Sequence, residues 1–198
     1  MASFVEFAAR PTTIGGLFVL DLRQVADERG TVRELFRRSA FDAAGIGELG
    51  PFLQVNVTET RRGALRGIHA EAMTKLVTVT LGSAFGAYLD LRPASPTFGT
   101  VETVELSPGT QVLVPSGVAN GFQALADQTQ YVYCFDREWV AGMVGQACNP
   151  LDPDLAGVGD AGPERRRNGR LAVMDMQLAG RHRHHHVVVV VAVPAGMA

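Results

Sequence analysis

The sequence predicts an all-β protein in which short antiparallel strands close into a sandwich or a jelly-roll barrel. Runs of β-branched and aromatic residues recur at regular spacing, and Gly, Pro, Asp and Ser separate them. Helical periodicity is scarce. The chain has 198 residues, of which 46 % are hydrophobic and 19 % charged, as expected for one globular domain with its own core.

The expected strands follow one another between residues 16 and 136. The first covers residues 16–25 and ends at a turn over residues 26–30. Residues 31–41 begin extended and close in a helical turn. The remaining strands are short and separated by turn residues, and they are expected at residues 52–60, 64–70, 75–82, 83–92, 100–106, 110–115, 120–126 and 129–136.

The composition changes after residue 158. Residues 159–198 contain clustered arginines, four of the chain's five histidines and a run of valines. We therefore expect a domain over residues 1–158 and a poorly ordered, low-complexity tail over residues 159–198. We expect no functional metal site in the tail, because a run of histidines offers no preorganised geometry.

Charge, hydropathy and cysteine content argue against several classes of protein. A net charge of -2 with no long basic run in the domain argues against a nucleic-acid or membrane-surface partner. The sequence has no apolar stretch of about 18 residues, and its N-terminus lacks the pattern of a signal peptide. Cys134 and Cys148 have neither metal-type nor disulfide spacing, which indicates thiols in a reducing cytoplasm.

His69 is the one histidine of residues 1–158. A lone histidine on an apolar strand is more often a core residue. Two features favour a functional role: Gly67 permits close approach of backbone or ligand, and Lys75 opens the next strand. Because side chains alternate along a strand, Arg66 and His69 point to opposite faces unless Gly67 interrupts the pleat.

The candidate residues indicate acid–base chemistry without a metal or cofactor. A metal-binding barrel needs two or three histidines and a carboxylate, whereas His69 and Glu71 supply only two ligands. Tyr133 is the second candidate, because a phenol with a pKa near 10 suits a general acid. Tyr133 shares a face with Tyr131, so packing of an aromatic pair is the alternative interpretation.

Several segments resemble, in order, the dTDP-4-dehydrorhamnose 3,5-epimerases, which are metal-free enzymes with the cupin fold. The most specific are GALRGIH at 63–69 and LDLRPASPTFG at 89–99. The resemblance covers about residues 12–155. The other matching segments are DERG at 27–30 with Glu34, QVN at 54–56, the strand opening with Lys75, VPSGVANGFQAL at 114–125, the strand with Tyr133, and DP at 152–153.

The resemblance implies a cupin jelly-roll barrel with short helical turns and an irregular C-terminal tail. It implies that His69 is the catalytic base, that Tyr133 donates a proton to the opposite face of the sugar, and that Lys75 lies beside the C4 oxygen. It also implies a set of substrate-binding residues and a homodimer: Arg66 at the phosphate, Gln54 and Asn56 lining the site, and Arg29 and Glu34 reaching the nucleotide bound to the partner subunit.

The implied substrate is a dTDP-4-keto-6-deoxyhexose, inverted at C3, C5 or both. The protons at these carbons flank the C4 ketone, so removing one builds an enolate with charge on the C4 oxygen. A fixed cation such as Lys75 stabilises that charge where it develops. A histidine such as His69 suits the base, because an imidazole can accept a proton near neutral pH.

The chain also departs from the family pattern. Asn120 stands where the family has a second histidine, Gly86 where it has an aspartate, and Trp139 where it has a second tyrosine. We still expect Asn120 and Trp139 to bind substrate, the first by hydrogen bonding and the second as an aromatic surface for a base or sugar. The family motif that orients the catalytic histidine has no match after Val158, and Asp175 lies at a comparable distance.

Two other functions remain open. Asn120, Gly86 and the divergent tail favour a catalytically silent protein that binds a nucleotide sugar. A sugar 3,4-ketoisomerase is a related cupin enzyme, although such enzymes typically carry a further histidine in the barrel.

Overall fold

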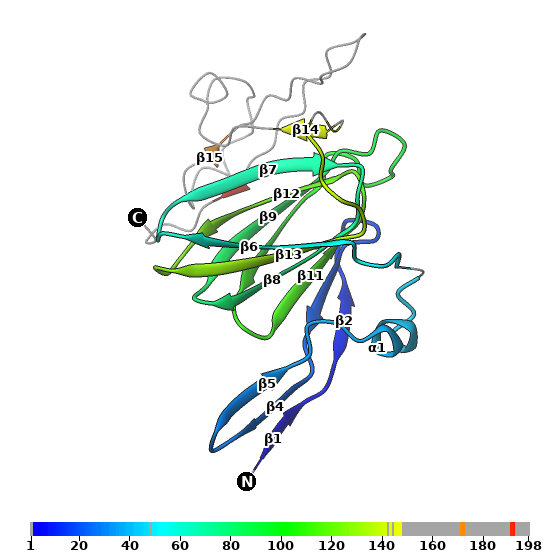
Figure 1. Ribbon diagram of the computed structural model, residues 1–198. Helices are drawn as coiled ribbons and strands as arrows, with labels where there is room; N and C mark the ends of the chain where they lie inside the picture. Colours follow the sequence, from blue (N-terminus) through cyan, green and yellow to red (C-terminus); the bar gives the residue numbers. More distant parts are fainter. Residues whose placement is uncertain are drawn as a thin grey trace.

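The structure, a computed structural model, describes residues 2–47, 49–141, 143 and 145–147, together with the backbone of residues 171–172 and 191–192. Two antiparallel sheets face each other across one core (Figure 1). The five-stranded sheet has the order β10-β9-β12-β7-β14 and contains β7 (Leu65–Glu71), β9 (Ala84–Asp90), β10 (Val101–Leu106), β12 (Val118–Ala124) and β14 (Gly145–Ala147). The six-stranded sheet has the order β2-β3-β11-β8-β13-β6 and contains β2 (Ala8–Pro11), β3 (Phe18–Asp21), β6 (Gln54–Thr60), β8 (Lys75–Leu81), β11 (Thr110–Val114) and β13 (Thr129–Phe135).

The core lies between the sheets and takes side chains from both. Val77 of β8 and Val112 of β11 pack in one buried cluster with Tyr88 of β9 and Phe122 of β12. A second cluster lies on the other face of the six-stranded sheet, where Leu76 packs with Phe41. Both faces of β8 are covered at its start, and its first five residues, 75–79, are all buried.

A smaller three-stranded sheet extends from the body (Figure 1). It contains β1 (Ser3–Val5), β4 (Gln24–Asp27) and β5 (Gly30–Arg33), and we call it the arm. Helix α1 (Arg38–Ala43) follows the arm and buries Phe41. Strands β15 (Leu171–Ala172) and β16 (Val191–Ala192) pair with each other.

The all-β, antiparallel architecture confirms the fold class predicted from the sequence. The prediction of a single strand at residues 16–25 was wrong, because this stretch is divided into β3 and β4. Leu22 follows the last residue of β3. Its side chain is buried, and its backbone N–H donates to the Gly109 carbonyl oxygen at 2.8 Å. The chain then leaves the six-stranded sheet for the arm. Strands β1, β2 and β14 were not expected.

No helix in the described part of the chain is long and apolar enough to cross a membrane. The predicted tail falls almost entirely outside the described residues, as does Asp175. The cytoplasmic location stays a prediction.

Candidate active site

A bulge in β7 turns Arg66 and His69 toward the same side. In the pairing with β12, His69 lies opposite Asn120 and Arg66 opposite Phe122, so β7 has one more residue than β12 over this stretch. Directly opposed residues of an antiparallel pair point to the same face. Phe122 packs in the core between the sheets, and the Asn120 side chain reaches Lys75 on the facing sheet. Arg66 and His69 therefore both face the barrel interior.

Two glycines make this bulge sterically accessible. Gly67 has φ +103°, a region that L side chains rarely adopt. A Cβ on Gly67 would lie 2.7 Å from the Gly121 Cα, and a Cβ on Gly121 would lie 2.8 Å from the Arg66 carbonyl oxygen. The glycine of the GALRGIH segment thus interrupts the pleat and lets the two strands touch.

Lys75 lies at the start of β8 with its ammonium in the interior. The residue is only 3 % exposed. Its Nζ donates to a Glu71 carboxylate oxygen, to Asn120 Oδ1 at 2.8 Å and to the His69 carbonyl oxygen at 3.3 Å. The backbone of the predicted base and the predicted cation are therefore in direct contact.

Tyr133 comes from the facing sheet. On β13 it lies opposite Val77 of β8 and Asn56 of β6, and Val77 is a residue of the interior core. Burial raises the pKa of Tyr133 to about 12, although the Arg66 charge and a hydrogen bond with Thr58 act in the other direction. The phenol therefore keeps its proton at neutral pH, as a proton donor to carbon requires.

An aromatic stack forms the floor of the site. Phe122 and Tyr131 stack at 4.0 Å between ring centroids, and Tyr131 contacts Tyr133 at 4.8 Å. The expected packing of Tyr131 against Tyr133 is thus present, and Tyr133 remains partly exposed at the open end.

Arg66 is held by β6. Its Nε donates to Thr60 Oγ1 at 2.9 Å, and its Nη2 donates to the Glu59 carbonyl oxygen at 3.4 Å. Arg66 also lines a cavity of about 380 Å³ together with Arg61. Glu59 lines this cavity too, so two guanidinium groups face one carboxylate and the lining has an excess of positive charge.

Three further predicted site residues, Gln54, Asn56 and Trp139, are linked by hydrogen bonds. Gln54 Nε2 donates to Asn56 Oδ1 at 3.1 Å, and Gln54 Oε1 accepts from the Trp139 backbone N–H at 2.7 Å. The exposed Trp139 ring is thereby anchored through its backbone beside β6.

Arg29 and Glu34 lie apart from this constellation in the same chain. Arg29 is exposed at the turn of the arm, where its Nη2 contacts an Asp27 carboxylate oxygen at 2.5 Å. Glu34 accepts from Arg37 and from Arg23, and these contacts hold its pKa at about 2. Glu34 also lines a cavity of about 440 Å³.

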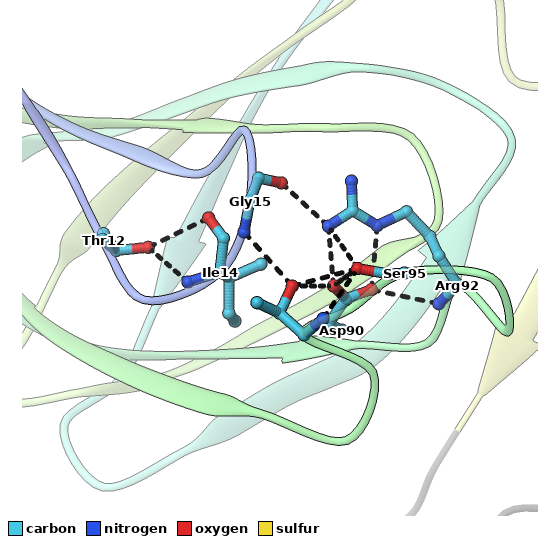
Figure 2. Close-up of polar contacts among 7 residues, drawn as sticks. Thr12, Ile14, Gly15, Asp90, Arg92 and Ser95 are labelled. Atoms are coloured by element: carbon cyan, nitrogen blue, oxygen red, sulfur yellow. Dashed lines mark hydrogen bonds and ion pairs between the residues drawn. The ribbon is translucent and has the colours of Figure 1, made fainter.

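Residues 90–97 of the specific segment LDLRPASPTFG form a clamp of polar contacts that also includes Gly15 (Figure 2). The fully buried Asp90 carboxylate accepts from Arg92, from Ser95 Oγ at 2.7 Å and from Thr97 Oγ1 at 2.6 Å. Arg92 also donates to the Gly15 carbonyl oxygen at 2.8 Å. Burial alone would raise the pKa of Asp90, but these donors hold it below its usual value.

Sequence reasoning missed the supporting residues of the site. Glu71 was considered only as a metal ligand, and Thr60 was not singled out. Thr60 follows Gln54 and Asn56 at even spacing on β6, so period-two alternation was an available signal. The Glu71 contact had no such signal, because the residues between Glu71 and Lys75 cross from one sheet to the other.

Neither a metal cluster nor a partner for the His69 ring is found among the described residues. They contain no group of three or more His, Cys, Asp or Glu that could hold a metal ion. No hydrogen bond within this part of the chain joins the His69 ring to a carboxylate. Metal-free chemistry and the orienting carboxylate therefore stay predictions.

Comparison with known proteins identifies the family. The family model of dTDP-4-dehydrorhamnose 3,5-epimerase matches residues 11–158. The chain is 34 % identical over 151 residues to the dTDP-4-dehydrorhamnose 3,5-epimerase of Streptomyces griseus, covering 74 % of each protein. It is also 34 % identical over 151 residues to the dTDP-4-dehydro-6-deoxyglucose 3-epimerase of Streptomyces bikiniensis, covering 73 % of this chain and 76 % of the relative.

A solved structure supports the same assignment. The epimerase RmlC from Legionella pneumophila, in complex with dTDP-4-keto-L-rhamnose, superposes with a TM-score of 0.69 at 30 % identity. The match covers 76 % of this chain and 81 % of that one. The chain therefore belongs to the dTDP-4-dehydrorhamnose 3,5-epimerase family of isomerases.

Proposed function

We propose that this protein inverts C3, C5 or both in a dTDP-4-keto-6-deoxyhexose, with His69 as the base and Tyr133 as the acid. The observation that carries the proposal is the placement of His69, Lys75 and Tyr133. They come from three strands and two sheets, and all three face one interior space. Base and acid on opposite sheets suit removal of a proton from one face of a carbon and its return to the other.

Lys75 supplies the electrostatic part of this reaction. The enolate formed on proton removal carries its charge on the C4 oxygen, and an ammonium already in place stabilises that charge without reorganisation. Asn120 accepts from Lys75 and leaves it protonated, because an amide does not titrate near neutrality.

Arg66 and the cavity that it shares with Arg61 suit the diphosphate of the substrate. Binding energy from this remote group then supports the step at carbon. Gln54, Asn56 and the Trp139 ring line the mouth where the sugar and its nucleotide enter.

We propose a homodimer in which Arg29 and Glu34 reach the partner subunit's nucleotide. The arm extends away from the strands that carry His69 (Figure 1). It exposes apolar side chains that a second copy would cover, since Phe4 is 63 % and Val32 70 % exposed. Sedimentation equilibrium tests this: a monomer at all concentrations contradicts the dimer.

Proton exchange tests the reaction. The full chain is incubated in D2O with dTDP-4-keto-6-deoxyglucose, and the sugar is followed by NMR. Deuterium at C3 and C5 indicates double inversion, and deuterium at C3 alone matches the action named for the Streptomyces bikiniensis relative. Binding without exchange supports the catalytically silent binding protein, and migration of the ketone supports the ketoisomerase. Either result ends the epimerase proposal.

Dialysis against a chelator tests whether the chemistry is metal-free, and we expect the rate of exchange to be unchanged after it.

A further inference from the structure

Each of the three hydrogens on the Lys75 ammonium already has an acceptor in this structure. An ammonium has three donors and no acceptor. Glu71, Asn120 and the His69 carbonyl take one each. A substrate oxygen must therefore replace one of these acceptors, and the His69 carbonyl at 3.3 Å is the longest contact and the first to yield.

The other two contacts fix the ammonium from the facing sheet. Glu71 is the last residue of β7 and Asn120 lies in β12, both in the five-stranded sheet, whereas Lys75 begins β8 in the six-stranded sheet. Residues 72–74 make the crossing between the sheets, and Met73 is buried there at 1 % exposure. The ion pair is shielded from water, with side-chain exposures of 4 % for Lys75 and 18 % for Glu71.

We propose that Glu71 is a positioning residue of the site, whose carboxylate keeps the Lys75 ammonium charged and holds Nζ beside His69. The inference rests on the proposed function, since it concerns the cation assigned to the C4 oxygen. Asn120 offers a neutral acceptor and Glu71 a negative one, so only Glu71 compensates the buried positive charge.

The electrostatic surroundings of Lys75 support this assignment. Burial lowers the pKa of Lys75, and the charge and hydrogen bond of Glu71 oppose that shift. The other titratable groups on strands packed against Lys75 are Arg66 and His69 of β7 and Tyr131, Tyr133 and Cys134 of β13. Strands β11 and β12, which also adjoin it, carry no titratable side chain. Glu71 is thus the one carboxylate on the strands packed against Lys75.

The chain offers a direct measurement, because Lys75 is its only lysine. Protein labelled with [ε-¹³C]lysine gives one lysine side-chain signal in NMR, whose titration reports the charge of Lys75 without any turnover. Glu71→Gln keeps the shape and the acceptor oxygen but removes the charge. We expect the variant's signal to titrate at lower pH than that of the wild type.

Turnover is measured on the same proteins. In Glu71→Gln we expect kcat to fall about 10- to 100-fold, KM to change little, and the basic limb of the pH–rate profile to move to lower pH. Glu105→Gln makes the same chemical change on the exposed edge strand β10 and should match the wild type in every readout. Glu71→Asp should recover part of the rate, because it restores the charge with a shorter reach.

Moving the carboxylate separates charge from architecture. The double variant Glu71→Gln with Asn120→Asp places the negative charge on β12, on the other partner of Nζ. We expect its lysine titration to return toward that of the wild type.

An unchanged Lys75 titration in Glu71→Gln overturns the inference even if the protein is an active epimerase. If Glu71→Gln lowers the pH at which Lys75 titrates, as expected, but the wild-type protein never exchanges substrate protons, the assignment of Glu71 stands and the proposed function fails. If Glu71→Gln does not fold, the same titration in Glu71→Asp and in the double variant decides.

Discussion

Lys75 and Asn120 join the two sheets inside the barrel, with Nζ donating to Oδ1 at 2.8 Å. The resemblance expects a histidine where Asn120 stands, and in this structure the amide oxygen accepts from the buried ammonium. A histidine at this position would compete for protons near neutral pH, whereas the amide can only accept or donate a hydrogen bond. Under the proposed function, proton transfer falls to His69 and Tyr133, and Asn120 acts as an acceptor for the Lys75 ammonium.

Replacing His69 should stop the reaction without harming the fold. The His69 side chain is exposed at the mouth, so His69→Ala removes little packing. We expect kcat to fall about 10²- to 10⁴-fold, the usual contribution of a general base. Deuterium exchange at C3 and C5 measures it, and added imidazole should restore part of the rate. Undiminished exchange would place the base elsewhere.

Tyr133→Phe should lower turnover while keeping the aromatic floor. The loss expected for a proton donor is about 10²- to 10⁴-fold. Because the pKa of Tyr133 is raised to about 12, the phenol is protonated throughout the working range, and its removal should leave the basic limb of the pH–rate profile unmoved. Tyr131→Phe, on the same strand and face, is the matched control and should retain activity. Equal losses in both variants would indicate a packing role instead.

The bulge in β7 depends on Gly121. A Cβ there would lie 2.8 Å from the Arg66 carbonyl oxygen, so Gly121→Ala must push β7 and β12 apart. We expect a loss of about 1–3 kcal/mol in unfolding free energy, together with loss of activity as His69 and Arg66 shift. Gly47→Ala is the control, since a Cβ at Gly47 meets nothing within 4 Å. Urea unfolding compares the two, and equal stabilities would show that the strands relax without cost.

The Asp90 clamp should contribute to stability more than to chemistry. Asp90→Asn leaves Arg92 without its carboxylate and should cost about 2–3 kcal/mol in unfolding free energy at pH 7. The exposed pair of Asp42 with Arg38, 4.0 Å apart, offers a control, and Asp42→Asn should change stability by less than about 0.5 kcal/mol.

The pH dependence of this loss follows from the lowered pKa of Asp90. Its contribution is fully present above the unfolded pKa of about 3.9 and is lost as pH falls toward the folded value. The difference between wild type and Asp90→Asn should therefore shrink in acid. A constant difference from pH 7 to pH 3 would contradict the ionised clamp.

The sequence by itself determined most of the strands between residues 52 and 136, the single histidine of residues 1–158, and the motifs that predict roles for Lys75 and Tyr133. These signals are local, since alternation and turn residues act over a few positions. Other features depended on the tertiary structure, because they join residues distant along the chain or on different sheets. The bulge that turns Arg66 and His69 to one side appears only in the register with β12. The Glu71–Lys75 pair exists because the chain crosses between sheets within three residues, and no periodicity encodes that crossing.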